Sequence, residues 1–378
     1  MCIGRIFAKK MMRIKVRAFV LWISLFCTVG NVSAQQYDKK KAAGKPDPQL
    51  SQKDNDYIDR QDKVFLDTIR AILSKYPPSV PEHRQRNMAK LLMDAVFHDA
   101  FAVYRSPVQQ FFRQRVDQVI LELETTKVEK GIRIWKVYNI GFIARTKTVT
   151  IAFDLVTGIT SGSPDFAMSA EQVSRIAAQC DVLLISHRHF DHADKEMALQ
   201  FLEMGLPVVA PDQAWKDDSI HDRITHLKRV AEIPQRLKLR NCSLDLIVYP
   251  GHQMKSIDNN VYLVTTPEGI TLAHLGDQIN EGDFMIDYDW IDKVGLNHRV
   301  DVLMPNAWTM DIFRIVKGFN PELVMPGHEL EMGHVVWDRL PYWGDDEYLE
   351  LNYAELKRSK YPVLVTVWGE SYHYLPKK

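Results

Sequence analysis

The 378-residue chain is poor in cysteine. It has four cysteines, and only Cys180 and Cys242 lie beyond the first 34 residues. A single pair cannot form the disulfide framework that staples a small secreted domain, and both residues stand at the entry to apolar runs. We therefore interpret them as buried thiols that do not bind a metal, and a bridge between the two is the alternative.

Long apolar runs are also lacking, and none is long enough for a comfortable membrane span. The apolar run at 18–29 follows basic residues and precedes small residues at 32–34, which is the layout of a secretory signal peptide. We expect cleavage after Ala34 and a periplasmic or secreted protein. Lipid attachment at Cys27 is the alternative, although the residues before it match a lipobox poorly.

The chain has no excess of positive charge, with 48 Lys and Arg against 48 Asp and Glu. All six charged residues of 1–34 are basic, so cleavage would leave 42 bases against 48 acids. An acidic mature chain has no electrostatic footprint for nucleic acid and argues against a nuclease. The hydrophobic and charged fractions, 46% and 25%, are those of an ordinary globular protein.

Composition and periodicity divide the chain into four regions. A polar segment follows the signal peptide and should be a flexible linker, apolar residues then recur at helical spacing, and strand-like runs begin at Gly131. The predicted regions are a signal peptide (1–34), a linker (35–56), an N-terminal helical region (57–130) and an α/β domain (131–378). Within the helical region we expect helices at 58–76, 88–104 and 107–124, and the C-terminal run 363–369 has the composition of a strand.

The segment Ser186-His187-Arg188-His189-Phe190-Asp191-His192 organises the α/β domain. Three imidazoles and a carboxylate fall within six residues, directly after the buried-strand pattern at 181–185 and before a helical pattern at 193–204. The end of a strand that opens into a loop and a helix is where α/β sheets hold their chemistry. The spacing indicates a metal site.

Three later strand ends offer further ligands, namely His252, the pair His274 and Asp277, and His328. A glycine lies shortly before His252, Asp277 and His328, and we expect it to let the backbone bend sharply there. One tetrahedral ion does not need so many ligands, so the set suggests two ions. Two-metal hydrolysis also needs a carboxylate that can bridge.

This ordered series resembles the metallo-β-lactamase-fold hydrolases, and the residues from about Gly131 to the C-terminus take part in the resemblance. In motif it is similar to the group of ascorbate-6-phosphate lactonase and the phospholipase-D-like enzymes of N-acyl-phosphatidylethanolamine. Class B β-lactamases commonly have cysteine where this chain has Asp277. Arg188 and the N-terminal helices match nothing specific. The resemblance implies an α/β fold, the αββα sandwich, with an N-terminal helical extension.

The resemblance also implies two divalent ions and a ligand set. His187, His189 and His252 would bind the first ion; Asp191, His192 and His328 would bind the second; and Asp277 would bridge them. Asp191 and Asp277 would be the catalytic carboxylates. Zn²⁺ is the expected metal, and the carboxylates would also accept Mn²⁺ or iron.

Three further residues are expected around the site. We expect Asp154, at the end of a strand, to fix a histidine tautomer or the loop, and His274 to have a supporting role. Trp308 is a candidate wall of the substrate pocket, and the Gly/Ser-rich loop 157–164 is the candidate opposite wall and lid. A core position is the alternative for Trp308.

These features favour an exported dinuclear-metal hydrolase of a small-molecule ester, lactone or phosphodiester. Two alternatives stay open: a mononuclear-iron member of the same fold that metabolises sulfur or oxygen, and a non-catalytic metal-binding protein. The substrate and the oligomeric state do not follow from the sequence, because specificity in such folds lies in loops.

Overall fold

The computed structural model describes residues 47–97, 99–158, 163–254, 256–278, 282–307, 309, 311–328, 332 and 359–377. All of them belong to one compact unit, Pro46–Lys378. The predicted signal peptide, most of the predicted linker and Trp308 lie outside the described residues. Within the described part of the chain, no helix is both long enough and apolar enough to cross a membrane.

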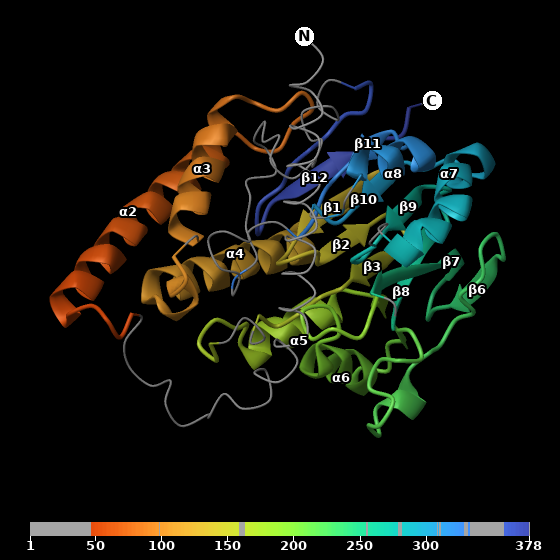
Figure 1. The fold of residues 1–378 in the computed structure, drawn as a ribbon, viewed down its shortest axis with the longest axis horizontal. Helices are drawn as coiled ribbons and strands as arrows, with labels where there is room; N and C mark the ends of the chain where they lie inside the picture. The colour runs from red at the N-terminus through yellow and green to blue at the C-terminus, as the bar shows by residue number, and fades with distance from the viewer. Residues whose placement is uncertain are drawn as a thin grey trace, which may run out of the picture. The chain divides into compact units, whose positions relative to one another are not determined.

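The described chain begins with helices, and strands interspersed with further helices follow (Figure 1). The α-helices are α2 (Gln52–Lys75), α3 (Gln85–Phe97), α4 (Ser106–Thr125), α5 (Ala170–Ala178), α6 (Lys195–Glu203), α7 (Tyr288–Asn297) and α8 (Ile312–Phe319). Short 3₁₀ turns are η1 (Ala102–Tyr104), η3 (His221–Arg223) and η4 (Gly282–Asp287). The strands are β1 (Ile132–Lys136), β2 (Phe142–Arg145), β3 (Thr150–Phe153), β4 (Val182–Leu184), β5 (Val208–Val209), β6 (Gln235–Lys238), β7 (Ser243–Met254), β8 (Ile257–Thr265), β9 (Thr271–His274), β10 (Val302–Met304), β11 (Leu323–Val324) and β12 (Ser371–Tyr374).

The strands form two mixed sheets. One has the order β12-β1-β2-β3-β4-β5, and the other has the order β11-β10-β9-β8-β7-β6. In the first sheet β3, β4 and β5 are parallel, and in the second β9, β10 and β11 are parallel. The parallel strands of each sheet therefore end at a common edge.

Alternating side chains along the strands decide which core each residue joins. In β4, Val182 and Leu184 point into the core between the two sheets, whereas Leu183 packs against the helices. In β7, Leu246 faces the core between the sheets and Ile247 faces the opposite side. Because successive side chains of a strand point to opposite faces, a strand covered on both faces is apolar throughout.

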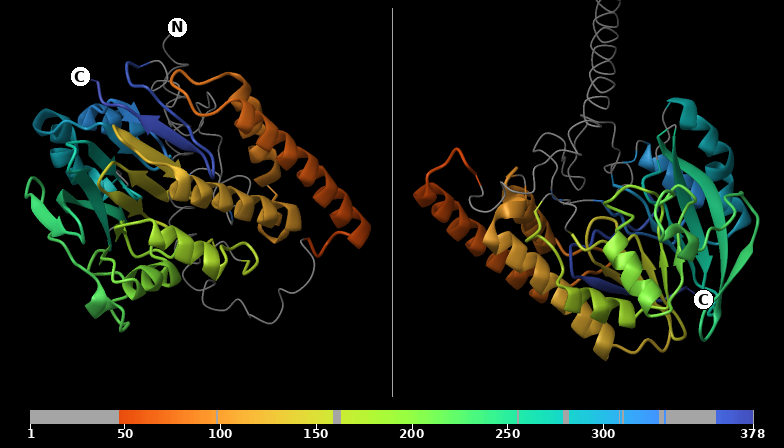
Figure 2. Two further views of the ribbon diagram at one scale, coloured as in Figure 1. Left: turned by 180° about the vertical axis from the view of Figure 1, so that it is seen from behind. Right: turned by 90° about the horizontal axis from the view of Figure 1, so that it is seen from below.

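Three apolar cores therefore separate four layers. Helices α2 to α6 cover the outer face of the first sheet, the two sheets pack face to face, and α7 and α8 cover the outer face of the second sheet (Figures 1 and 2). This confirms the predicted αββα sandwich with an N-terminal helical extension.

The N-terminal helices are continuous with the sandwich. Buried residues of α2, α3 and α4 belong to the same apolar cluster as those of α5, α6 and the first sheet. Arg86 of α3 is fully buried and makes two 2.6 Å contacts with the carboxylate of Glu370, just before β12. Helix α2 begins at Gln52, where the Ser51 side chain accepts the N–H of Asp54, so the predicted linker ends too late.

Two further expectations are wrong in detail. The second helix ends at Phe97 rather than at Tyr104, and η1 follows it. The run 363–369 is not a strand: it makes one bridge, Val363 to Val324, and the strand is β12, which pairs with β1. This run is apolar because its buried side chains enter all three cores.

Candidate metal centre

The expected site residues gather where strands end. Asp154 follows β3 and the histidine-rich loop follows β4, while Asp277 and His328 follow β9 and β11. Strand β7 runs in the same direction as β9, because both are antiparallel to β8, and His252 lies near its C-terminal end. Ligands far apart in the sequence thus reach one edge of the sandwich.

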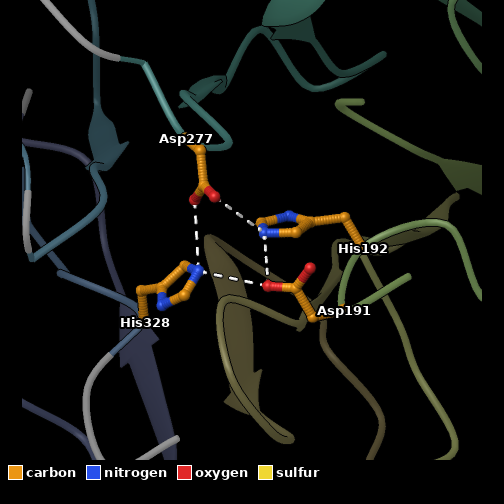
Figure 3. Close-up of side chains that lie close together, drawn as sticks. All are labelled: Asp191, His192, Asp277 and His328. Carbon is orange, nitrogen blue, oxygen red and sulfur yellow. Dashed lines mark ion pairs between the residues drawn. The ribbon is translucent and has the colours of Figure 1, made fainter. Parts of the chain in front are cut away.

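Four side chains form the first group: Asp191, His192, Asp277 and His328 (Figure 3). His192 Nε2 lies 3.3 Å from Asp191 Oδ2 and 3.2 Å from Asp277 Oδ2. His328 Nε2 lies 3.5 Å from Asp191 Oδ2 and 3.3 Å from Asp277 Oδ1. Four ligand atoms therefore surround one point, within 4.8 Å of one another.

Asp277 also belongs to a second group, with His187 and His189. His187 Nε2 lies 3.6 Å from Asp277 Oδ2, and the ligand atoms of this group again lie within 4.8 Å of one another. His252, expected here, is in neither group; its Nδ1 lies 3.1 Å from both carboxylate oxygens of Asp287. The structure thus brings together six of the seven expected ligands.

The charges of the two groups are strongly coupled. Burial alone would raise the pKa values of Asp191 and Asp277, but the adjacent His192 outweighs it and holds both well below their ordinary value. Burial lowers the pKa of His187 to about 3, with help from His192, so its imidazole is neutral. Burial opposes protonation of His192 as well, but three carboxylates raise its pKa well above the ordinary value. The ionised carboxylates of this centre therefore favour the binding of a cation.

The histidines present their nitrogens as metal ligands do. His187 Nδ1 lies 3.0 Å from Ser186 Oγ, and His192 Nδ1 lies 2.8 Å from Asp154 Oδ2, so each ring is held from outside. The Nε2 atoms of both rings are buried and have no hydrogen-bond partner among the described residues. A ligating histidine typically gives its other ring N–H to such a partner. The residues present therefore fit divalent metal ions.

The comparisons with known sequences agree with this geometry. Residues 142–328 match the model of the β-lactamase superfamily domain. These bounds include all seven expected ligands, together with Asp154 and His274. The chain belongs to the metallo-β-lactamase superfamily of metal-dependent hydrolases. No curated protein matches the chain.

Solved structures of this superfamily fold resemble the chain at low identity. Igni18, a metallo hydrolase from Ignicoccus hospitalis, has a TM-score of 0.46 and 18% identity, covering 66% of this chain and 100% of its own. An isothiocyanate hydrolase from Delia radicum gut bacteria gives 0.45 and 13%, with coverages of 64% and 99%. CmlA, a diiron β-hydroxylase from Streptomyces venezuelae, gives 0.45 and 16%, with coverages of 66% and 55%. Likenesses this distant say nothing about the substrate of this chain.

Asp154 and His274 lie behind the ligands of this superfamily member. Asp154 is fully buried with φ of 41°, and its carboxylate accepts the Ser186 N–H at 2.7 Å and the Ser186 hydroxyl at 2.6 Å. His274 stacks on Phe153, and its Nδ1 lies 3.9 Å from Asp154 Oδ2. Asp154 thus makes the histidine contact expected of it, and His274 supports Asp154 rather than joining a ligand group.

Three polar residues of the site were missed from the sequence. Asn306 Nδ2 donates to Asp277 Oδ1, and Gln253 Nε2 donates to Asp277 Oδ2, both at 2.7 Å. Asp287 holds the His252 ring and also accepts from Gln278 Nε2 at 2.6 Å. No spacing rule marks these residues, although Gln253 directly follows a predicted ligand and Asn306 follows a strand.

Of the three glycines before the ligands, Gly276 alone makes the bend expected of it. Gly276 has φ of 51°, as a sharp bend before Asp277 requires. Gly251 instead lies within β7, where an added Cβ would come 2.0 Å from Gln278 Oε1. Close packing, not a bend, requires glycine there.

At the third site the positive φ belongs to the ligand itself. His328 has φ of 72°, and Gly327 before it does not have a positive φ. A Cβ on Gly327 would lie 2.6 Å from Ile140 Cγ1. Here too glycine permits a close approach of two segments.

The expected pocket walls are described only in part. Trp308 and residues 159–162 of the loop lie outside the described residues. At the start of that loop, the Thr157 N–H and hydroxyl donate to Asp194 Oδ2 at 2.7 and 2.6 Å. The roles of Trp308 and of the loop as pocket walls remain predictions.

A third cluster contains His221 and His226, for which no ligand role was expected. Together with Asp212 they form a partly exposed group. The two nitrogens of His226 face the backbone oxygens of Ala210 and His221, at 3.0 and 3.4 Å. Its ring is therefore already engaged by the backbone.

Proposed function

We propose that the protein is an exported dinuclear-metal hydrolase that cleaves a small-molecule ester, lactone or phosphodiester. The observation that supports this best is the position of Asp277, whose carboxylate belongs to both ligand groups. A carboxylate shared by two sets of imidazoles is what a pair of ions requires of a bridging ligand. We propose Zn²⁺ as the metal, because sites rich in imidazole suit it, while the carboxylates would also accept Mn²⁺ or iron.

When ions are bound, the site gains Lewis acidity and a water of lowered pKa. The contribution of the protein is to fix the ligands beforehand. Asp277 is held at both oxygens by Asn306 and Gln253, and the His192 ring is held by Asp154. Ligands fixed from outside need little reorganisation during the reaction.

We place His252 with His187 and His189 around the first ion. Its Nδ1 faces Asp287 at 3.1 Å, so Nε2 would be its ligand atom. Asp191, His192 and His328 would hold the second ion. Asp287 would then do for His252 what Asp154 does for His192.

The reaction class is tested by turnover. Purified protein loaded with Zn²⁺ is assayed against a panel of lactones, carboxylic esters and phosphodiesters, with chelator-treated protein and the Asp277→Ala variant as controls. We expect turnover within at least one class, its loss on chelation and its return with added Zn²⁺. Metal-loaded protein that turns over no member of the panel would instead favour a non-catalytic metal-binding protein.

A further inference from the structure

Asn139 touches two members of the first ligand group from outside. It lies fully buried in the turn between β1 and β2. Its side-chain Nδ2 donates to the Asp191 backbone oxygen at 3.1 Å and lies 3.3 Å from Asp191 Oδ2. Its backbone oxygen accepts the His328 N–H at 3.2 Å. One residue thus joins the loop after β4 to the turn after β11.

Lys136 supports Asn139 from behind. Its side chain is fully buried, and Nζ donates to the same Asn139 backbone oxygen that receives His328 N–H. The ammonium lies 4.4 Å from the centre of the Phe142 ring. A Cβ on Gly327 would come 3.1 Å from Lys136 Nζ, so the turn that carries His328 packs directly on this lysine.

Asn139 is an unfavourable choice for stability alone. Its φ of 50° lies in the left-handed region, which glycine adopts with less strain than any residue with a Cβ. Its Oδ1 is buried without a hydrogen-bond partner among the described residues, and a buried acceptor left unpaired is destabilising. Glycine would avoid both costs, so the carboxamide has a purpose other than stability.

We propose that Asn139, supported by Lys136, is a positioning residue for the ligand group of Asp191, His192, Asp277 and His328. The carboxamide orients the Asp191 carboxylate, and the backbone oxygen fixes the start of the His328 side chain. Asn139 is not itself a ligand and acts through these two residues. The inference rests on the proposed two-ion site.

The test is Asn139→Gly, which suits the backbone conformation and removes only the carboxamide. Zn²⁺ is titrated into metal-free protein in competition with a chromophoric chelator, and melting temperature is measured on the same samples. We expect the ion held by His187, His189 and His252 to bind as in wild type. The ion held by Asp191, His192 and His328 should bind about 10–100-fold more weakly, as when other residues behind metal ligands are changed. The melting temperature of the metal-free variant should stay level or rise.

Two further variants separate positioning from general damage. Lys136→Met keeps most of the side-chain length and should weaken the second ion less than Asn139→Gly does, because the carboxamide remains. Asn320→Gly is the matched control, since Asn320 has φ of 45° at the end of α8, away from the ligand groups. It should leave both affinities unchanged.

The positioning role of Asn139 and the two-ion proposal would be contradicted by different results. Unchanged affinity for the second ion in Asn139→Gly, or weaker binding of both ions together with a lower melting temperature, would overturn the positioning role and leave the two-ion proposal intact. A wild-type protein that binds only one ion would overturn the proposed function, and this inference with it.

Discussion

The Asp154 carboxylate lies 2.8 Å from His192 Nδ1, on the side of the ring opposite the ligand group. His192 Nε2 faces Asp191 and Asp277 at 3.3 and 3.2 Å. The neighbouring His274 and His192 overcome the effect of burial and lower the pKa of Asp154, so it stays ionised. An ionised carboxylate at Nδ1 keeps the proton there and leaves Nε2 available to a metal.

Asp154→Asn should therefore weaken metal binding while keeping the fold. The amide can present a donor to Nδ1, which would favour the wrong tautomer of His192. We expect about a 10–100-fold loss in affinity for the second ion, measured by chelator competition. Asp301→Asn is the control, because Asp301 is an equally buried carboxylate that binds the Thr271 N–H and Tyr374. Equal losses in both variants would contradict a role specific to His192.

Asp62 should make the stability depend on pH. Burial raises its pKa to about 7, against the effect of Arg105 and with the help of Asp99 and Asp59. A carboxyl whose folded pKa exceeds its unfolded value of 3.8 takes up a proton on folding. Its contribution is therefore fully present below about pH 4 and is lost as pH rises toward 7.

Asp62→Asn removes this titration. The variant should gain in melting temperature over wild type progressively between about pH 4 and pH 7, then keep that advantage at higher pH. Arg105 retains Asp59 at 3.0 Å, so it is not left without a carboxylate. A difference between variant and wild type that stays constant over this range would show that Asp62 does not titrate there.

The pair of Arg86 and Glu370 should fasten the N-terminal helices to the sandwich. Both side chains are buried, and removing one partner leaves a buried charge. Glu370→Gln should cost about 3 kcal/mol in free energy of unfolding, near the low end for such pairs, because Glu82 stays 3.0 Å from Arg86. Glu124→Gln is the control: it breaks the exposed pair with Arg175 and should change denaturant unfolding little.

Export is tested on protein from the native source. The basic, apolar and small-residue segments of 1–34 predict a mature N-terminus at Gln35 and a location outside the cytoplasm. N-terminal sequencing measures this directly. Met11 and Met12 are alternative start residues, so an uncleaved chain would begin at Met1 or at one of them. Such an N-terminus, or a lipid on Cys27, would show that the segment is not removed as proposed.

Much of the fold and most of the ligand set could be predicted from apolar periodicity and from the spacing of the histidines and carboxylates. The apolar strand before His187 and the strand-end residues through His328 could be predicted, because an unbroken apolar run is typical of a buried strand and such a cluster of histidines is rare by chance. The sandwich also buries both faces of β4, which explains why residues 182–185 are apolar without a gap.

What the sequence could not supply depends on contacts between distant segments. Asn139, Gln253 and Asn306 are ordinary amides until the fold brings them beside Asp191 and Asp277. The same is true of Gly251, where a side chain is excluded by Gln278, a residue that follows another strand. Such requirements have no local signature in the chain.

The number of metal ions bound per chain tests the central proposal most directly. Elemental analysis of purified wild-type protein, run beside Asp277→Ala, should give close to two ions for wild type and at least one fewer for the variant, together with loss of hydrolysis. Asp277 belongs to both ligand groups, so its removal should weaken both. One ion in the wild type, with hydrolysis unaffected by Asp277→Ala, would contradict the two-ion site.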